Sequence, residues 1–356
     1  MAVGGREATP VLPRGCGGEK VAGVKAIIVK RPGGEEELHL TELPPPALGP
    51  GEVRIRVVAT ALNRADLLQR QGRYPPPPGA SDVLGLECAG EIIEVGEGVS
   101  PARRGERVMA LLAGGGYAEE AVAPAGCALP APPSLSWEEA AALPEAALTV
   151  FLTIFRIAAW RPGERVLVHG GGSGIGTTAI AMLREAGGEI LVTAGSQEKC
   201  RRCMTLGVTA AICYRCEEFP QRVCELTDGE GVHIVLDHIG GPYLAGNLAA
   251  LAEGGRLVLI GTMGGSEAAI DLRLLMRKRL SVFGSTLRSR PAAEKEKLAA
   301  AFWDTFGEAV AAGRLRPVID SVFPLADVAE AHRRMASGAH MGKIVLRVGV
   351  SSPLPP

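Results

Sequence analysis

The chain has 356 residues, 47% of them hydrophobic, and a formal net charge of −1 at pH 7. This length is typical of about two domains, and the hydrophobic content is enough for a sizeable core. The balanced charge and the lack of a long basic block argue against nucleic acid as a partner. No apolar run reaches the ~18 residues of a membrane-spanning helix.

The first 23 residues contain acidic as well as basic side chains and lack an apolar signal core. We therefore expect a disordered leader over 1–23 rather than a secretory signal. Residues 351–356 are expected to form a short tail. A cytoplasmic location is expected, and a mitochondrial one is the alternative if the leader is a transit peptide.

The first part of the chain, about 25–130, is β-rich. Four segments alternate or run apolar as strands do: 24–29, 52–60, 91–96 and 105–110. The segment 62–71 could instead form a short helix. Ser136 followed by Glu139 predicts a helix start with a capping box.

From about 164 to 285, strand and helix patterns alternate, as in a parallel sheet covered on both faces. Six strands are predicted: 165–169, 190–194, 210–213, 232–236, 256–260 and 280–284. A helix is expected over 291–312, and strand-type segments return at 318–324 and 343–348. The expected fold is α/β, with a doubly wound, Rossmann-type domain inserted into a β-rich domain and the active site in the cleft between them.

Four of the eight cysteines form two C-x-x-C pairs whose spacing is like that of a zinc ribbon: Cys200 with Cys203 and Cys213 with Cys216. The first pair falls in a predicted helix over 197–206, and the second begins where the predicted strand 210–213 ends. Both elements already have places in a β-α-β succession. We therefore expect reduced thiols and no metal site.

A glycine-rich turn joins the strand 165–169 to the helix that follows. Strand, glycine turn and helix bring backbone N–H groups and the positive end of a helix to a pyrophosphate. The glycines fit G-x-x-G-x-G, and an ordinary tight turn is the alternative. The candidate cofactor-binding residues are Gly171, Ser173, Gly174, Ile175 and Gly176.

The end of the next strand bears on the choice of coenzyme. NAD enzymes usually place Asp or Glu there to bind the ribose 2′-hydroxyl. This chain has no carboxylate at the strand tip and offers the hydroxyl of Ser196 and the ammonium of Lys199. These groups suit a 2′-phosphate, so we expect NADPH. The alternative is that Ser196 only caps a helix and Lys199 is solvated.

With these elements in place, the chain resembles the medium-chain dehydrogenase/reductase superfamily over residues 24–348. Within it, the chain is similar to the zinc-free quinone oxidoreductase branch, which includes zeta-crystallin. The segments that carry the resemblance are 61–74 (ALNRADLLQRQGRY), 84–87 (LGLE), 113–116, 143–146, 193–197, 287–290 and 342–346. The resemblance implies a GroES-like catalytic domain at 24–145 and 286–350 and an NADP-binding Rossmann domain at 146–285.

The same resemblance bears on catalysis. Zinc-containing relatives carry Cys in place of Asn63 and Gly-His-Glu in place of 85–87, so the metal ligands are absent here. The resemblance places Tyr74 and Asn63 near the nicotinamide, where a phenol or amide could donate to a quinone oxygen. The alternatives are that Tyr74 packs on the proline loop 75–78 and that Asn63 only caps the next helix.

Further cofactor contacts are implied by the resemblance alone. They are Thr149 near the nicotinamide, Tyr214 near the adenine, Gly261, Met263 and Ser285 after two strands, and Lys343. The alternatives are a buried helix hydroxyl for Thr149, a strand-end aromatic for Tyr214 and an exposed strand start for Lys343.

The expected function is zinc-independent hydride transfer from NADPH to quinones or related conjugated carbonyls, by a homodimer. An alkenal or enone double-bond reductase is one alternative. Another is an NADPH-binding structural or RNA-binding protein of zeta-crystallin type.

Overall fold

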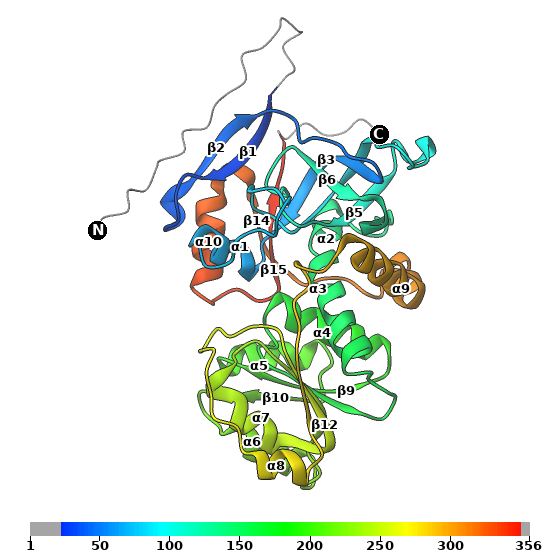
Figure 1. Cartoon of the computed structure of the whole chain (residues 1–356). Helices are drawn as coiled ribbons and strands as arrows, with labels where there is room; N and C mark the ends of the chain where they lie inside the picture. The colour runs from blue at the N-terminus through cyan, green and yellow to red at the C-terminus, as the bar shows by residue number, and fades with distance from the viewer. Residues whose placement is uncertain (1–22, 350–356) are drawn as a thin grey trace, which may run out of the picture.

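A computed structural model describes residues 23–349, which form an upper and a lower region in Figure 1. The upper region contains the N-terminal strands together with β14 (Ile319–Pro324) and β15 (Lys343–Arg347). The lower region contains a parallel sheet with its helices. The predicted leader, up to residue 22, and the predicted tail 351–356 lie outside the described residues.

The upper region is built on a seven-stranded, mostly antiparallel sheet in the order β14-β15-β3-β4-β5-β7, with β6 paired to β3. Its other strands are β3 (Glu52–Ala61), β4 (Glu87–Val95), β5 (Arg107–Leu111), β6 (Glu120–Pro124) and β7 (Ala128–Pro130). A separate hairpin pairs β1 (Val24–Val29) with β2 (Leu38–Leu43). The four predicted strands are confirmed with shifted ends, whereas the sequence patterns did not indicate β2, β6 or β7.

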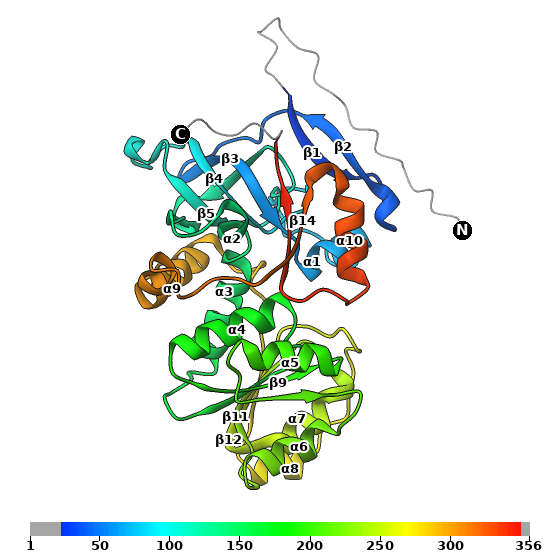
Figure 2. The same cartoon turned by 180° about the vertical axis from the view of Figure 1, so that it is seen from behind.

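Helices cover the upper sheet and link it to the lower region (Figure 2). They are α1 (Arg64–Arg70), α2 (Trp137–Ala141), α3 (Pro144–Val150), α9 (Ala292–Ala311) and α10 (Val328–Ala336). The predicted capping box of α2 is confirmed, because Ser136 Oγ accepts from the Glu139 N–H at 3.1 Å and the Glu139 carboxylate accepts from the Ser136 N–H at 2.8 Å. The short helix predicted over 62–71 is confirmed as α1.

The lower region contains a six-stranded parallel sheet in the order β10-β9-β8-β11-β12-β13. Its strands are β8 (Arg165–Val168), β9 (Glu189–Ala194), β10 (Ala210–Cys213), β11 (Val232–Asp237), β12 (Leu251–Leu259) and β13 (Ser281–Gly284). Its helices are α4 (Gly174–Glu185), α5 (Gln197–Thr205), α6 (Phe219–Leu226), α7 (Leu244–Ala250) and α8 (Leu272–Arg277). The strand order reverses between β8 and β11, which is where doubly wound sheets bind ligands.

The two regions meet at the glycine turn. Ser173 forms a parallel bridge with Gly342, and the Gly342 N–H donates to the Gly172 carbonyl at 2.9 Å. One apolar core runs through both regions and includes Leu148 on α3, Ile180 on α4 and Phe302 on α9. The predicted α/β fold with an inserted doubly wound domain is therefore confirmed, whereas the domain boundaries stay predictions.

Between residues 23 and 349, no helix combines the length and the apolar character needed to cross a membrane.

Candidate active site

The glycine turn between β8 and α4 is held in a tight conformation. Gly170 has a φ of +68°, and a Cβ there would lie 2.5 Å from the His238 ring. A Cβ on Gly176 would lie 2.3 Å from the Gly170 carbonyl oxygen. Ser173 Oγ accepts from the Gly176 N–H at 2.9 Å and caps α4. Because glycine is required for this close approach, the turn presents backbone at the start of a helix, the setting that suits a pyrophosphate.

A buried ion pair lies beside this turn. The Lys343 ammonium donates to Glu87 Oε1 at 2.6 Å and to Asn63 Oδ1 at 2.7 Å. The Lys343 side chain is 3% exposed and the Glu87 side chain 0%. The Lys343 stem crosses Gly174, where a Cβ would lie 2.5 Å from Lys343 Cδ. Lys343 is therefore not the exposed strand-start residue that was the alternative.

Asn63 is fully engaged within this cluster. Its Nδ2 donates to Glu87 Oε1 at 2.9 Å and its Oδ1 accepts from Lys343. The other Glu87 oxygen accepts from the Glu145 N–H at 2.9 Å. These contacts favour a positioning role for Asn63, and its donation to substrate stays a prediction.

Asp66 fixes the two loops that carry the cluster. Its carboxylate accepts from the N–H groups of Asn63 at 2.7 Å and Gly85 at 3.1 Å, and from the Tyr117 hydroxyl at 3.1 Å. Burial raises the pKa of Asp66 to about 6, although these hydrogen bonds oppose the rise. The Asp66 contacts thus set the spacing of Asn63 and Glu87.

Glu145 and Thr149 lie on α3 next to the cluster. The Thr149 hydroxyl donates to Glu145 Oε1 at 3.4 Å. Burial raises the pKa of Glu145 to about 7; the Lys343 charge opposes this rise and the Glu87 charge adds to it. Glu145 can therefore gain or lose a proton near neutral pH.

Tyr74 lies against Arg288. The guanidinium carbon is 5.5 Å from the centre of the Tyr74 ring. Burial raises the pKa of Tyr74, although the Arg288 charge opposes that rise, so the phenol keeps its proton at neutral pH. A protonated phenol can donate a hydrogen bond, as the predicted catalytic role requires.

The end of β9 holds the residues predicted to select the coenzyme. Ser196 Oγ accepts from the Lys199 N–H at 3.2 Å and caps α5. The half-buried Lys199 side chain donates from its ammonium to the carbonyls of Gly338 at 2.7 Å and His340 at 2.6 Å. Tyr214, after β10, covers Gly195, where a Cβ would lie 2.7 Å from the phenol oxygen. The coenzyme contacts of these three residues stay predictions.

The remaining predicted residues lie at the carboxyl ends of the strands. Gly261 and Met263 follow β12 and Ser285 follows β13. Ile175 lies half-buried in the first turn of α4. Ser285 Oγ is buried without a hydrogen-bond partner in the part of the chain that the structure describes. Together with the glycine cradle, this free hydroxyl fits a nicotinamide coenzyme lying along the strand ends.

Sequence reasoning missed four members of the site: Asp66, Glu87, Glu145 and Arg288. All four fell in the segments that carry the resemblance. Charged residues are usually exposed, so nothing in their local pattern indicates burial.

Two families match the chain. Residues 49–133 match the alcohol dehydrogenase GroES-like domain, and residues 206–346 match the family described as zinc-binding dehydrogenase. Among curated proteins, a mycocerosic acid synthase-like polyketide synthase of Mycobacterium tuberculosis is 33% identical over 325 residues, 90% of this chain. The chain spans 15% of the length of that relative.

Several solved structures resemble nearly the whole chain. An NAD-dependent alcohol dehydrogenase is 33% identical, with a TM-score of 0.80 and coverage of 91% of this chain and 100% of that one. A quinone oxidoreductase of Pseudomonas syringae pv. Tomato DC3000 is 31% identical, with a TM-score of 0.80 and coverage of 91% and 99%. The CurK enoyl reductase is 28% identical, with a TM-score of 0.80 and coverage of 92% and 100%.

The fold, the glycine cradle and these similarities define a nicotinamide-dependent oxidoreductase. The chain belongs to the medium-chain dehydrogenase/reductase superfamily.

The residues at the cluster do not fit the zinc that one family description implies. Leu86 offers no ligand atom, and both Glu87 oxygens already accept hydrogen bonds, one of them from an ammonium. Zinc needs about three protein ligands plus an open position. Within residues 23–349, no group of three or more His, Cys, Asp or Glu side chains is arranged to hold a metal ion.

Proposed function

We propose that this oxidoreductase reduces quinones or related conjugated carbonyls with NADPH and without a metal ion. The observation that carries the proposal is the cluster of Lys343, Glu87 and Asn63. An internal ammonium takes up the carboxylate and amide oxygens that a metal would need. The acceptor carbonyl must then be polarised by a protein donor, and the position of the Tyr74 phenol supports that role.

The proposed reaction adds one hydride and one proton to the acceptor, so that a quinone becomes a hydroquinone. NADPH, when bound, supplies the hydride. Tyr74 donates a hydrogen bond to the acceptor oxygen, and solvent supplies the net proton. The Lys343 cluster and Asp66 keep the adjoining loops in place.

The first test compares Tyr74→Phe with the parent protein. We expect turnover with quinones to fall by about 10- to 100-fold, because the phenol donor is lost, while NADPH affinity is unchanged. NADPH absorbance at a series of quinone concentrations separates the two quantities. Tyr243→Phe, a control at a more distant aromatic ring, should change neither. If the parent protein oxidises no NADPH with ortho- or para-quinones, the proposal fails.

The choice of NADPH rests on Ser196 and Lys199. We propose that a 2′-phosphate replaces the carbonyls of Gly338 and His340 as acceptors of the Lys199 ammonium. Lys199→Ala should then weaken NADPH binding by about tenfold or more and leave NADH nearly unaffected, whereas Arg201→Ala on the same helix should alter neither. Equal losses for both coenzymes would show that Lys199 only ties down the 338–340 loop.

Reduction of an enone or enoyl double bond is a second candidate. It is favoured by the similarity to the CurK enoyl reductase and to the polyketide synthase. Product analysis separates the candidates, because a saturated ketone and a hydroquinone differ in mass and absorbance.

We also propose a homodimer formed through the free edge of β13. This strand pairs only with β12 among the described strands, and three apolar side chains near it are exposed: Leu272, Met276 and Val282. Such an edge invites pairing with a second copy. Sedimentation should show a dimer in the parent protein and a monomer for Val282→Lys.

A cytoplasmic rather than mitochondrial location is likewise a proposal, testable by cell fractionation.

A further inference from the structure

Arg288 carries a buried positive charge whose hydrogen-bonding groups are largely unused. The residue is only 6% exposed. Nε donates to the Ala113 carbonyl at 2.8 Å, but Nη1 and Nη2 have no hydrogen-bond partner among residues 23–349. No carboxylate in the same described range forms an ion pair with it. The Asp66 charge acts on Arg288 without forming an ion pair with it, and a buried charge without a bonded counter-ion is costly, so the fold retains a group that lacks its partner.

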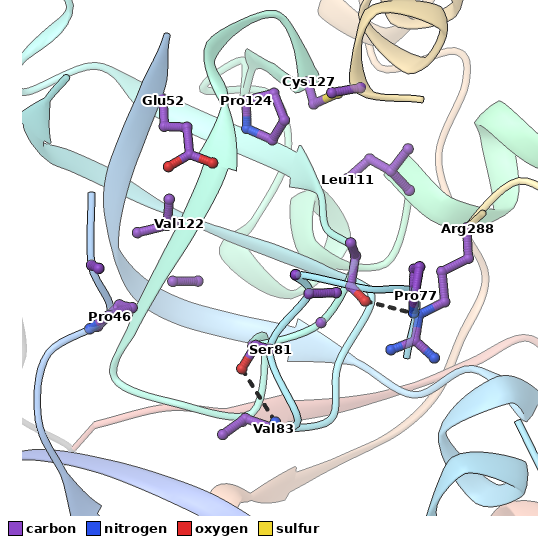
Figure 3. Close-up of a pocket in the computed structure, with 18 of the residues that line it drawn as sticks. Pro46, Glu52, Pro77, Ser81, Val83, Leu111, Val122, Pro124, Cys127 and Arg288 are labelled. Carbon is purple, nitrogen blue, oxygen red and sulfur yellow. Dashed lines mark hydrogen bonds between the residues drawn. The ribbon is translucent and has the colours of Figure 1, made fainter. Parts of the chain in front are cut away.

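Arg288 lies in the wall of a cavity of about 800 Å³ (Figure 3). The remaining wall is mainly apolar and includes Pro77, Val83, Leu111 and Cys127. In Figure 3 the guanidinium lies beside the loop that carries Pro77. A cavity of this volume and lining suits the apolar body of a small molecule.

The other charged groups of the cavity leave a net positive end at Arg288. Lys295 is buried close by and donates to the Arg288 carbonyl at 3.2 Å, and Arg290, also in the wall, pairs with Glu294 at 3.0 Å. Glu52 and Glu120 also line the cavity, but Glu52 accepts from the Gly49 N–H at 2.8 Å and Glu120 pairs with Arg54 at 3.3 Å. The acidic groups therefore have partners of their own, and the two free Arg288 nitrogens do not.

The cavity adjoins the candidate active site through Arg288 itself. The same guanidinium lies 5.5 Å from the Tyr74 ring centre. The cavity wall does not include Asn63, Thr149 or Lys343, so the cavity is a neighbouring compartment and not the nicotinamide site. A substrate reaching from Tyr74 past Arg288 would occupy both.

We propose that Nη1 and Nη2 of Arg288 bind the carboxylate of an apolar conjugated carbonyl substrate. Two parallel N–H groups match the two oxygens of a carboxylate, and a desolvated guanidinium strengthens such a pair. The apolar body lies in the cavity and the reacting carbonyl lies at Tyr74. This substrate class rests on the reductase activity proposed above, but the anion site itself does not.

Calorimetry on the full, coenzyme-free chain tests the site, with 2-naphthoate as the probe and neutral 2-naphthamide as its matched control. We expect one molecule of 2-naphthoate to bind, and 2-naphthamide to bind at least about tenfold more weakly. Arg288→Gln should remove the preference for 2-naphthoate over 2-naphthamide, and Arg288→Lys should keep only part of that preference. Arg222→Gln should keep it, because Arg222 lies outside the cavity wall and its guanidinium pairs with Glu225 at 2.8 Å. Equal binding of the two probes to the parent protein overturns the proposal.

A stability measurement distinguishes a ligand site from a structural role. If Arg288 serves a ligand, Arg288→Met should fold and unfold at a temperature equal to or above that of the parent, while 2-naphthoate binding is lost. If Arg288→Met unfolds at a lower temperature while Arg288→Lys keeps full 2-naphthoate affinity, Arg288 only braces the Ala113 loop and the proposal fails.

Turnover then tests the substrate class. Reduction of 4-(4-carboxyphenyl)-3-buten-2-one and of the uncarboxylated 4-phenyl-3-buten-2-one is compared in the parent and in Arg288→Gln. The loss in kcat/KM caused by the variant should be about tenfold or more larger for the carboxylated compound than for the uncarboxylated one. Equal losses for both compounds overturn the assignment. If calorimetry shows the preference but neither compound nor any quinone is reduced, the anion site stands and the proposed reductase activity fails.

Discussion

The glycine turn between β8 and α4 acts through its backbone, whereas the cluster at Lys343 acts through side chains from distant segments. The turn lies within 170–176, and its shape follows from glycines at positions that no Cβ can occupy. The cluster lies in the upper region and joins Asn63 and Glu87 to Lys343, which follows Asn63 by 280 residues in the chain. The two regions touch where the Lys343 stem crosses Gly174.

The glycine turn and the Lys343 cluster constrain the fold in different ways. The turn depends on steric room, so a single added carbon is enough to disturb it. The cluster depends on charge balance in a dry environment, where each ion is tolerated only because its partner is present. Substitutions at the cluster should therefore cost more stability than substitutions at the turn. Only at the cluster should a second substitution, of the partner ion, restore part of the loss.

Removal of the ammonium should have the largest effect. Lys343→Met leaves the Glu87 carboxylate buried without its cation, and we expect a loss of about 3–5 kcal/mol in the free energy of unfolding. Urea denaturation measures this loss. The double variant Glu87→Gln with Lys343→Met should be more stable than Lys343→Met, because neither charge remains.

Lys278→Met is the matched control, because the Lys278 ammonium is bonded to backbone carbonyls such as that of Leu251 at 2.6 Å. No carboxylate within residues 23–349 pairs with it, so the loss should be closer to about 1 kcal/mol. If both lysine variants lose the same stability, the charge balance of the cluster does not explain its stability.

The glycine turn should respond more weakly in stability but strongly in coenzyme binding. In Gly176→Ala the new Cβ meets the Gly170 carbonyl oxygen at 2.3 Å, so backbone must move. We expect a loss of about 1–3 kcal/mol in stability. NADPH affinity, followed by fluorescence, should fall by about tenfold or more, because the backbone donors leave their positions.

Gly284→Ala provides the comparison, since a Cβ at Gly284 has no atom within 4 Å and the residue does not have a positive φ. Its stability should stay within about 0.5 kcal/mol of the parent. A similar loss in both glycine variants would mean that strand-end backbone in general, and not steric room at the turn, limits stability.

The contrast between a local segment and a cluster of distant side chains explains which features the sequence could predict. Strand, turn and first helix of the lower sheet lie within about 20 consecutive residues, so local patterns indicate them, as they do the capping box of Ser136 and Glu139. The inserted doubly wound domain follows from a repeated alternation of such patterns. Short strands such as β7 (Ala128–Pro130) carry too few residues to show a period.

The buried charges were beyond local patterns. Asp66 sits in a short helix with the spacing of an ordinary N-terminal carboxylate, and only the fold shows that it joins the loops of Asn63 and Gly85. Lys343 lies at a strand start, where exposure is the usual expectation. Its burial depends on Glu87, which is 256 residues away in the chain. Resemblance to a family indicated Asn63 and Lys343 but gave no partner for either.

The smallest expected effect concerns Glu145, at the edge of the cluster. Burial raises the pKa of its carboxyl from 4.5 to about 7, an effect that Lys343 opposes and that Glu87 and Asp66 reinforce. Between these two values the folded state binds more protons than the unfolded state, so its stability falls as the pH rises from about 4.5 to about 7 and does not recover above it. Glu145→Gln should therefore be more stable than the parent at pH 8 and nearly equal to it near pH 4.5.

Glu138→Gln should show the opposite sign. Burial raises the pKa of Glu138, but the hydrogen bonds that its carboxylate accepts and the charge of Arg347 together outweigh burial and lower the pKa overall. This carboxylate therefore contributes stability above its unfolded pKa, and the contribution is lost as the pH falls through the folded value. Denaturant unfolding of the parent and both variants across pH 4–8 gives the slopes that are compared. If the free energies of unfolding of Glu145→Gln and the parent run parallel over this range, Glu145 does not titrate within the cluster. Lys343 and Glu87 are then the only charged pair of the cluster that affects its stability.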